Sequence, residues 1–335
     1  MSGVALARAR AQRLLGERLP DATAAVRELV GVQAQEPVAG ALSIRVRTTG
    51  LTRVDVERSL VEERSLVRLW AMRGTIHLVA AEDARWLVEL LAPAPLRASH
   101  RRLGQLGVPE RDRPRAVRAI QRALAAHGPL TRAELMEHVA RAGVTTAGQA
   151  AAHLPLIAAL EGLVCFGPTR AGKPSFVLRD DWLGSDLPRL PREQAVAELA
   201  RRYVRAFGPA TAEDFASWAG LPLGDARAGW AAIAGARAAP ARGTATPPDP
   251  PVVRLLPAFD TYLLGYRTRD FAVAAEHARR VWPGGGIVRP AVVANGVAVG
   301  TWRRSGGAVS IEPFAGAPAV DTADEVADVK RFLGS

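Results

Sequence analysis

Residues 127–143 read HGPLTRAELMEHVARAG, and this stretch decides the fold class. A Gly-Pro turn precedes Thr131, and Glu134 stands three residues later, so the pair predicts a capping box at the start of a helix. Just upstream, residues 115–126 (RAVRAIQRALAA) space their apolar side chains at the period of a helix. The two segments therefore predict two helices joined by a turn.

The residues that follow extend this arrangement. Residues 145–164 predict a third helix. Residues 163–182 predict two short strands on either side of a tip that contains Gly, Pro, Arg and Lys. Three helices followed by such a hairpin are typical of a winged helix-turn-helix.

The same order of elements is predicted on both sides of this segment. Towards the C-terminus, residues 192–235 predict three helices with less of a wing, and Thr211 with Asp214 repeats the capping pattern. Towards the N-terminus, residues 4–67 predict successive helices, and residues 66–80 predict two strands. The chain therefore carries three copies of one pattern.

The pattern changes beyond the third copy. Residues 236–251 are rich in Ala, Pro and Gly without an apolar period, which predicts a linker or surface loop. Short β-like runs follow, with Asn295 and Gly296 as a hairpin turn, and residues 325–334 predict a final helix. The predicted fold is α+β, with three tandem winged helix-turn-helix units and a small β-rich C-terminal domain. The predicted domains are 1–110, 111–188, 189–250 and 251–335.

Composition limits the class of protein. The 335 residues suit two to four compact units, and no stretch of about 18 apolar residues is free of charge, so we expect no membrane span. The first twenty residues distribute arginines through an amphipathic helix, which argues against a secretory signal. The single cysteine, Cys165, excludes an internal disulfide and a multi-cysteine metal site, and it fits a reducing cytoplasm.

The formal charge of +11 favours a polyanionic partner. A genome-wide bias towards Arg and Ala explains the charge equally well, because lysine occurs only at positions 173 and 330. The charge therefore needs support from the architecture before it indicates nucleic acid.

Residues 32–37, VQAQEP, place two amides and an acid before a proline. Proline disfavours the helical conformation of the preceding residue, so we expect the helix to end near Gln35. A partly extended backbone then brings Gln33 and Gln35 to the same side. The alternative is that both glutamines are solvated residues at a helix end.

Residues 72–79, MRGTIHLV, alternate in polarity and predict a strand. Its polar face would carry Arg73, Thr75 and His77, a possible wall for a phosphate or a reacting base. Solvated residues of a wing are the alternative.

Basic residues gather at four further places, and each is a candidate for DNA contact. The candidates are Arg97, Arg101 and Arg102 after a predicted helix, Arg170 and Lys173 at the wing tip, Arg267 and Arg269, and Trp302, Arg303 and Arg304 after the Asn-Gly turn. Trp302 could place an apolar plug near a groove. The mixed aromatic and charged segment 259–270, in a predicted strand-and-loop setting, fits either a contact surface or ion pairs that pack the last domain.

Taken together, these motifs resemble the AlkZ/YcaQ-type winged-helix DNA glycosylases over roughly residues 5–333. In that family a Gln-x-Gln or Gln-x-Asp motif is the catalytic signature, so the resemblance implies that Gln33 and Gln35 are catalytic. The Gln-x-Gln members resemble self-resistance enzymes of producers of DNA-alkylating antibiotics. Those enzymes excise bulky N3- or N7-alkylpurines or unhook crosslinks.

The resemblance also implies the partner and the limits of the chemistry. The expected partner is double-stranded DNA with alkylated purines, bound by a cytoplasmic, nucleoid-associated monomer on a concave surface. We expect no metal and no cofactor, a secondary role for Glu36, and no lyase step because no lysine lies near the motif. A winged-helix transcription regulator and a non-catalytic protein that sequesters damaged DNA or the drug remain the alternatives.

Overall fold

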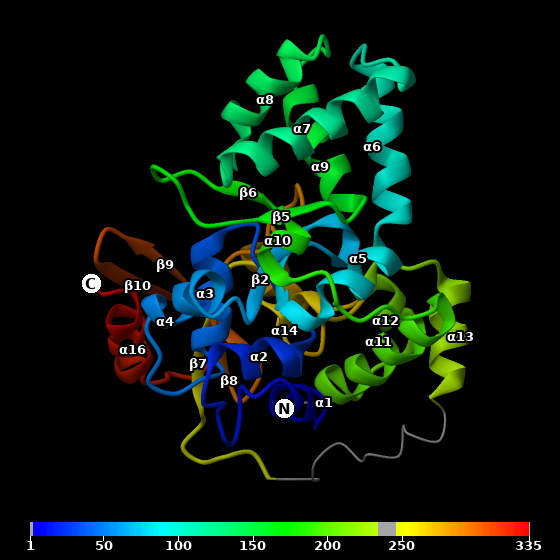
Figure 1. Cartoon of the computed structure of the whole chain (residues 1–335). Helices are drawn as coiled ribbons and strands as arrows, with labels where there is room; N and C mark the ends of the chain where they lie inside the picture. The colour runs from blue at the N-terminus through cyan, green and yellow to red at the C-terminus, as the bar shows by residue number, and fades with distance from the viewer. Residues whose placement is uncertain (1–2, 234–245, 335) are drawn as a thin grey trace. The chain divides into compact units, whose positions relative to one another are not determined.

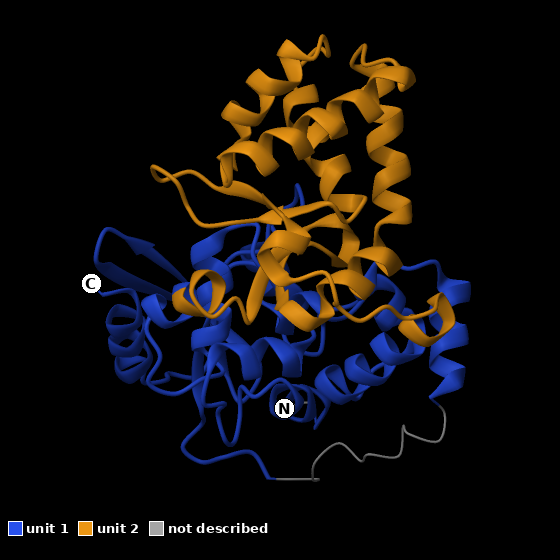
Figure 2. Cartoon of the chain, in the orientation of Figure 1, with its two compact units in different colours: residues 1–57, 196–335 blue, residues 58–195 orange. Residues whose placement is uncertain are grey.

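The computed structural model describes residues 3–233 and 246–334. The chain divides into two compact units, shown in blue and orange in Figure 2. Unit 1 combines Met1–Glu57 with Val196–Ser335, and unit 2 is Arg58–Ala195. The two units are defined by contacts in space, whereas the four predicted domains are defined by a repeated order of elements along the sequence. The four domains therefore stay a prediction.

Unit 1 joins the two ends of the chain (Figure 1). Its helices and strands are α1 (Gly3–Ala11), α2 (Ala22–Leu29), β1 (Val32–Gln33), α3 (Pro37–Arg45), the start of α4 (Arg53–Val61), most of α11 (Arg192–Phe207), α12 (Ala212–Ala219), α13 (Leu223–Ala232), β7 (Val253–Leu256), α14 (Thr261–Leu264), η5 (Ala275–His277), α15 (Ala278–Val281), β8 (Ala291–Ala294), β9 (Val297–Ser305), β10 (Ala308–Pro313) and α16 (Ala323–Leu333). The four strands β10-β9-β8-β7 form an antiparallel sheet in that order.

The core of unit 1 explains why the chain ends belong together. Leu6 and Ala9 of α1 pack in one apolar cluster with Leu256 of β7 and Tyr262 of α14. The hydroxyl of Tyr262 lies 3.0 Å from the carbonyl oxygen of Ala5, a residue 257 positions away. Burial of apolar surface across this sequence distance is the main stabilising term of such a unit.

The Asn-Gly hairpin predicted from the sequence is confirmed in this sheet. Asn295 and Gly296 connect β8 to β9 with φ of 49° and 87°. Two successive positive φ angles are what a two-residue hairpin turn requires. The predicted terminal helix is also confirmed, as α16.

Unit 2 has its own helices and sheet. Its elements are the end of α4, β2 (Leu66–Trp70), η1 (Met72–Gly74), β3 (Ile76–Ala80), η2 (Ala81–Asp83), α5 (Ala84–Leu91), α6 (Pro93–Gln105), η3 (Glu110–Asp112), α7 (Arg113–His127), β4 (Leu130–Thr131), α8 (Arg132–Arg141), α9 (Ala150–Leu160), β5 (Val164–Phe166), β6 (Ser175–Leu178), α10 (Arg179–Leu183) and the start of α11. Within unit 2 the strand order is β3-β2-β5-β6-β4, and each pair of neighbouring strands is antiparallel.

Residues 115–178 fold in the predicted order, as helices α7, α8 and α9 followed by strands β5 and β6, and the predicted turn before α8 also contains the two-residue strand β4. The capping box is confirmed, because the Thr131 side chain accepts from the Glu134 amide and the Glu134 carboxylate accepts from the Thr131 amide. The second predicted box, Thr211 with Asp214, is confirmed at the start of α12. Ile120 and Leu135 are fully buried where α7 and α8 pack together.

Two sequence expectations need correction or restriction. Residues 259–270 do not contain a strand, because Asp260 caps the short helix α14 by accepting from the Tyr262 amide. Of the predicted linker 236–251, residues 236–245 lie outside the described part of the chain, and residues 246–251 form neither helix nor strand.

The whole is a mixed α/β fold. None of the helices within residues 3–233 and 246–334 combines the length and the apolar character needed to cross a bilayer.

Candidate functional site

The Gln-x-Gln segment lies in a connection between two helices of unit 1. Helix α2 ends at Leu29, where Val30 takes the left-handed conformation (φ 62°) and Gly31 follows with φ 149°. The prediction that the helix continues to near Gln35 is therefore wrong, since these two positive φ angles end it earlier. The backbone then runs extended through the short strand β1.

The two glutamines differ in exposure. The Gln33 residue is buried, with 8% of its surface exposed, whereas Gln35 and Glu36 are exposed. In extended backbone, positions two residues apart face the same side. The extended backbone covers Val32 and Gln33, whereas Gln35 and Glu36 lie in a bend before α3, so the orientation of both amides towards one side stays a prediction.

Pro37 acts as the first residue of α3. Glu36 is the N-cap residue with φ −97° and ψ 107°, so the predicted exclusion of Glu36 from the helical conformation is confirmed. Its side chain makes no capping hydrogen bond. The carboxylate of Glu36 thus stays at the exposed edge of the segment.

Helix α3 rests directly on the Gln-x-Gln segment. A Cβ atom placed on Gly40 would lie 2.8 Å from the Cβ atom and 3.2 Å from the Cα atom of Ala34, and 3.3 Å from the carbonyl oxygen of Gln33. Ala34 is itself only 1% exposed. The first turns of α3 are therefore in close contact with the backbone between the two glutamines.

The far end of α3 is fixed by a buried ion pair. The Arg47 guanidinium donates to both carboxylate oxygens of Asp260, at 2.8 and 2.7 Å, and both side chains are fully buried. The hydroxyl of Ser43 donates to the same carboxylate. Burial opposes ionisation of Asp260, but the Arg47 charge and these hydrogen bonds outweigh it and hold the pKa of Asp260 below its ordinary value.

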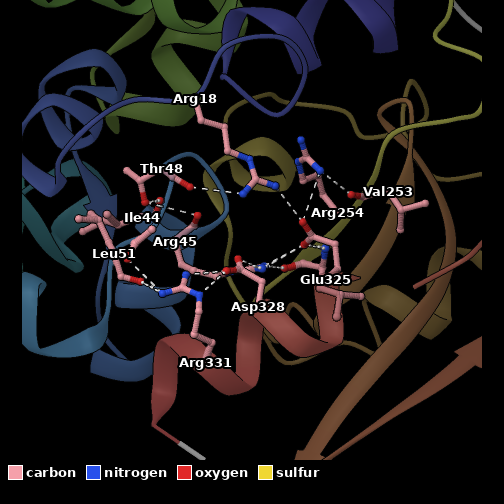
Figure 3. Close-up of polar contacts among 12 residues, drawn as sticks. Arg18, Ile44, Arg45, Thr48, Leu51, Val253, Arg254, Glu325, Asp328 and Arg331 are labelled. Carbon is pink, nitrogen blue, oxygen red and sulfur yellow. Dashed lines mark hydrogen bonds and ion pairs between the residues drawn. The ribbon is translucent and has the colours of Figure 1, made fainter. Parts of the chain in front are cut away.

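A second buried cluster surrounds Glu325 (Figure 3). The Glu325 carboxylate accepts from Arg45 at 3.1 Å, from Arg18 at 3.0 Å and from the Leu255 amide at 3.0 Å. Arg45 also donates to Asp328 at 3.0 Å and is only 1% exposed. The cluster ties α3 to α16 and β7, which come from the other end of the chain.

Arg45, Arg47 and Glu325 are not among the residues predicted from the sequence to be functional. The signal was present, because residues 41–47 (ALSIRVR) place two arginines in an otherwise apolar stretch, and buried cations require partners. For the segment 259–270, the packing explanation holds for Asp260 and Tyr262, which are both fully buried.

The Arg73 to His77 segment belongs to unit 2, and the predicted continuous strand is wrong. Arg73 takes a left-handed conformation (φ 57°) inside the short 3-10 turn η1, so Arg73 and Thr75 lie in the loop before β3. Every residue of β3 is buried, including His77 at 2% exposure. His77 is therefore not a solvated wing residue.

The His77 imidazole is neutral near pH 7. Burial, with the Arg73 charge adding to it, lowers the pKa of His77 to about 3 against the opposing hydrogen bond to Thr75. Since a carbonyl oxygen only accepts, Nδ1 of His77 carries the proton and donates to the Thr75 carbonyl at 3.0 Å.

The candidate basic residues of unit 2 lie on α6 and on the β5–β6 hairpin. Arg97 and Arg101 are exposed one turn apart on α6, whereas Arg102 donates to Gln149 at 2.8 Å. At the hairpin tip, Lys173 is exposed, and Arg170 pairs with Glu134 at 3.3 Å and donates to the carbonyl of Pro129.

The candidate residues of unit 1 divide into exposed and enclosed side chains. Arg267 is exposed, as are Arg303 and Arg304 on β9. Arg269 is half-buried and donates to the Leu263 carbonyl at 3.1 Å. Trp302 is 5% exposed and donates to the Leu256 carbonyl at 2.7 Å. The indole is part of the interior of unit 1 and is not presented as the predicted apolar plug.

The sequence and the structure were compared with those of known proteins. The family described as DNA glycosylase AlkZ-like matches residues 26–332. The chain belongs to the AlkZ-like DNA glycosylase family. The interstrand DNA cross-link repair glycosylase of Streptomyces sahachiroi is 30% identical over 88% of this chain and 85% of its own length. The solved structure of Streptomyces sahachiroi DNA glycosylase AlkZ matches with a TM-score of 0.80 at 28% identity, over 99% of this chain and 96% of that one.

For an AlkZ-like DNA glycosylase, the chemical capacity of the Gln-x-Gln segment is limited. Each amide offers an acceptor oxygen and two N–H donors but no strong base. Across residues 3–233 and 246–334, no three His, Cys, Asp or Glu side chains converge in the way a metal site requires. The segment can orient a water molecule and direct an amide dipole at a developing charge.

Proposed function

We propose that this protein is a monofunctional DNA glycosylase that excises bulky or cationic N7- or N3-alkylpurines, with Gln33 and Gln35 as its catalytic pair. Membership of the AlkZ-like family supports the reaction class. The observation that carries the site is the connection between α2 and α3, in which the extended segment Val32–Gln33 is followed two residues later by Gln35, before α3 begins at Pro37.

The chemistry needs no acid to activate the leaving base. Alkylation at N7 leaves the purine cationic, so the bonding electrons of the N-glycosidic bond pass to the ring and the base departs neutral. The sugar becomes oxocarbenium-like and is captured at C1′ by water, which releases a proton and yields an abasic site. An amide oxygen accepts a hydrogen bond from this water, and its dipole stabilises the sugar cation.

Glu36, Arg73, Thr75 and His77 stay a predicted wall of this site. The exposed position of Glu36 supports a secondary electrostatic role. For His77, neutrality near pH 7 fits a hydrogen-bonding role and not a cationic one.

DNA binding is proposed to rest on winged helix-turn-helix units and a concave surface. The order α7, β4, α8, α9, β5, β6 and the exposed Lys173 at the hairpin tip support the assignment of a wing. The other proposed phosphate contacts are Arg97, Arg101, Arg102, Arg170, Arg267, Arg269, Arg303 and Arg304. If about six phosphates are neutralised, the logarithm of the binding constant falls with log salt at a slope of about −5.

The biological setting is proposed from the relative's name. The Streptomyces sahachiroi protein is named an interstrand DNA cross-link repair glycosylase, which supports crosslink unhooking by this chain. We further propose self-resistance to a DNA-alkylating natural product, with the protein acting as a monomer at the nucleoid in the cytoplasm.

The decisive experiment uses duplex DNA that carries N7-alkylguanine. After incubation, alkali should cleave the strand at the abasic site. Gln33→Ala and Gln35→Ala should each lower the single-turnover rate by about 10²-fold, by analogy with the loss of one group that stabilises a transition state. Gln194→Ala, at an exposed glutamine of α11, serves as the control and should leave the rate unchanged.

If the DNA stays intact after incubation, the protein is not a glycosylase for this lesion. The alternatives are then a transcription regulator and a protein that sequesters damaged DNA or the drug. Base release that survives both glutamine substitutions would exclude the site while retaining the activity.

A further inference from the structure

We propose that Gly40 is a positioning residue for the Gln-x-Gln pair. The absence of a side chain at Gly40 lets α3 rest directly on the backbone between Gln33 and Gln35, and this contact fixes where the two amides point. The inference rests on the proposed function, because it assigns Gly40 a role in placing the proposed catalytic groups.

The contact leaves no room for a methyl group. A Cβ atom at position 40 would meet the Ala34 Cβ at 2.8 Å, whereas carbon atoms in van der Waals contact lie about 3.5–4.0 Å apart. Ala34 is 1% exposed, and its Cβ is bonded directly to the backbone, so it cannot rotate away. The Ala34 backbone would have to move by about 0.7–1.2 Å.

Backbone conformation does not explain the glycine. Gly40 lies within α3 and is absent from the residues with positive φ. Glycine in a helix interior destabilises the helix relative to alanine. The close approach to Ala34 and to the Gln33 carbonyl is the feature of this position that a glycine serves.

Helix α3 cannot easily retreat from a new methyl group. Arg45, the last residue of α3, is bound to Glu325, as Figure 3 shows, and Arg47, two residues further on, is bound to Asp260. These arginines are 1% and 0% exposed. Because breaking buried ion pairs is costly, the displacement should pass to Ala34 and its two glutamine neighbours.

The expected effect is on the chemical step. A misplacement of about 1 Å can cost on the order of 10²-fold in rate. Phosphate contacts do not depend on Ala34, so binding of DNA should be preserved. Gly40→Ala should therefore lower the single-turnover rate of base release by about 10- to 100-fold, with the Kd for the same duplex unchanged within about twofold.

The experiment compares three variants of the full chain on duplex DNA with N7-alkylguanine. Gly40→Ala is the test. Gly224→Ala is the matched control, because Gly224 lies in α13 with nothing within 4 Å of its added Cβ. The double variant Ala34→Gly with Gly40→Ala moves the methyl group from one side of the contact to the other and should recover most of the lost rate.

Recovery in the double variant is the result that a general loss of stability would not give, and thermal unfolding of each variant is measured beside it. If Gly40→Ala does not fold, the double variant alone decides, since it must fold and release base at a rate near that of the parent. A parent-like rate in Gly40→Ala, or no recovery in the double variant, overturns the positioning role. If Gln33→Ala and Gln35→Ala are both fully active, the proposed catalytic pair itself fails.

Discussion

Unit 1 and unit 2 both enclose polar side chains, but they hold them in different charge states. In unit 1, Arg47 and Asp260 are both fully buried as a bidentate ion pair, and Glu325 is 6% exposed among three arginines. In unit 2, the buried base of β3 is His77, which is neutral near pH 7. Both interiors exclude water, but the buried groups of unit 1 stay charged in ion pairs, whereas His77 of unit 2 is neutral.

The difference follows from the partners that the chain supplies. A charged group enters a protein interior when an opposite charge and hydrogen bonds replace its water, and otherwise it gives up the charge. Asp260 has the Arg47 fork at 2.7 Å, whereas the charge that acts on His77 is that of Arg73, which has the same sign as imidazolium. Two kinds of experiment test this difference. One removes a charged partner from a buried ion pair of unit 1, and the other lowers the pH to protonate His77 in unit 2.

The largest effect is expected from Arg47→Ala, which leaves the Asp260 carboxylate buried without its cation. Loss of one partner of a buried pair costs about 3–5 kcal/mol of unfolding free energy. Urea denaturation measures this loss. The control is Arg141→Ala, whose pair with Glu137 is 66% and 65% exposed and contributes little. Similar losses in the two variants would contradict the distinction between buried and exposed arginines.

Glu325→Gln tests the second cluster and should cost about 2–3 kcal/mol, because hydrogen bonds to charged groups are strong and an amide N–H group would face donors. The carboxylate now accepts from Arg18, Arg45, Arg254 and the Leu255 amide. Thermal unfolding gives the result, with Glu312→Gln as the control at an exposed carboxylate of the same unit. An unchanged Tm for Glu325→Gln would show that the cluster does not stabilise unit 1.

The features that local sequence can predict are the ones the structure confirms. The capping boxes at Thr131 and Thr211 need only residues three apart, and the turn at Asn295 needs only its neighbour. The order of elements from α7 to β6 likewise follows from apolar period and turn residues, because both act within one element.

The errors arise where the backbone or the partner departs from the local pattern. The helix before Gln33 ends early because Val30, a β-branched residue, takes a left-handed conformation that its type disfavours. Arg73 interrupts a strand in the same way. The acidic partners of Arg45 and Arg47 lie more than 200 residues away, so a local pattern carries no sign of them.

For the candidate site, the sequence draws attention to two residues but not to their setting. The motif letters single out Gln33 and Gln35 as a predicted pair, whereas the contact with Gly40 depends on how α3 packs. The sequence shows a glycine at position 40, but it does not show that this glycine contacts Ala34.

The unit 2 side of the comparison is tested by pH. His77 has a folded pKa of about 3 against an ordinary value of 6.5, so between these values the unfolded chain binds a proton that the folded chain does not. The unfolding free energy should therefore fall as the pH drops below 6.5, by about 2 kcal/mol at pH 5 for this group alone.

His77→Asn removes the titration while keeping an N–H donor for the Thr75 carbonyl. The variant should lack this component of the pH dependence, and the difference between the two urea-denaturation series from pH 7.5 to 5 isolates it. Parallel series would mean that the imidazole is not held neutral by the fold.

The smallest effect on stability is expected where the arginines face water, and there the effect should appear in DNA binding. Arg304 is exposed on β9, and its guanidinium donates to the Gly306 carbonyl. If it contacts a phosphate, Arg304→Ala should reduce the slope of log Kd against log salt by about 1, while the Tm stays the same. Arg141→Ala removes the same charge from a helix outside the proposed contact set and should leave the slope unaltered. Equal changes of slope in both variants would mean that the net charge governs DNA binding and that Arg304 makes no specific phosphate contact. The exposed arginines would then differ from the buried ones only in contributing little to stability.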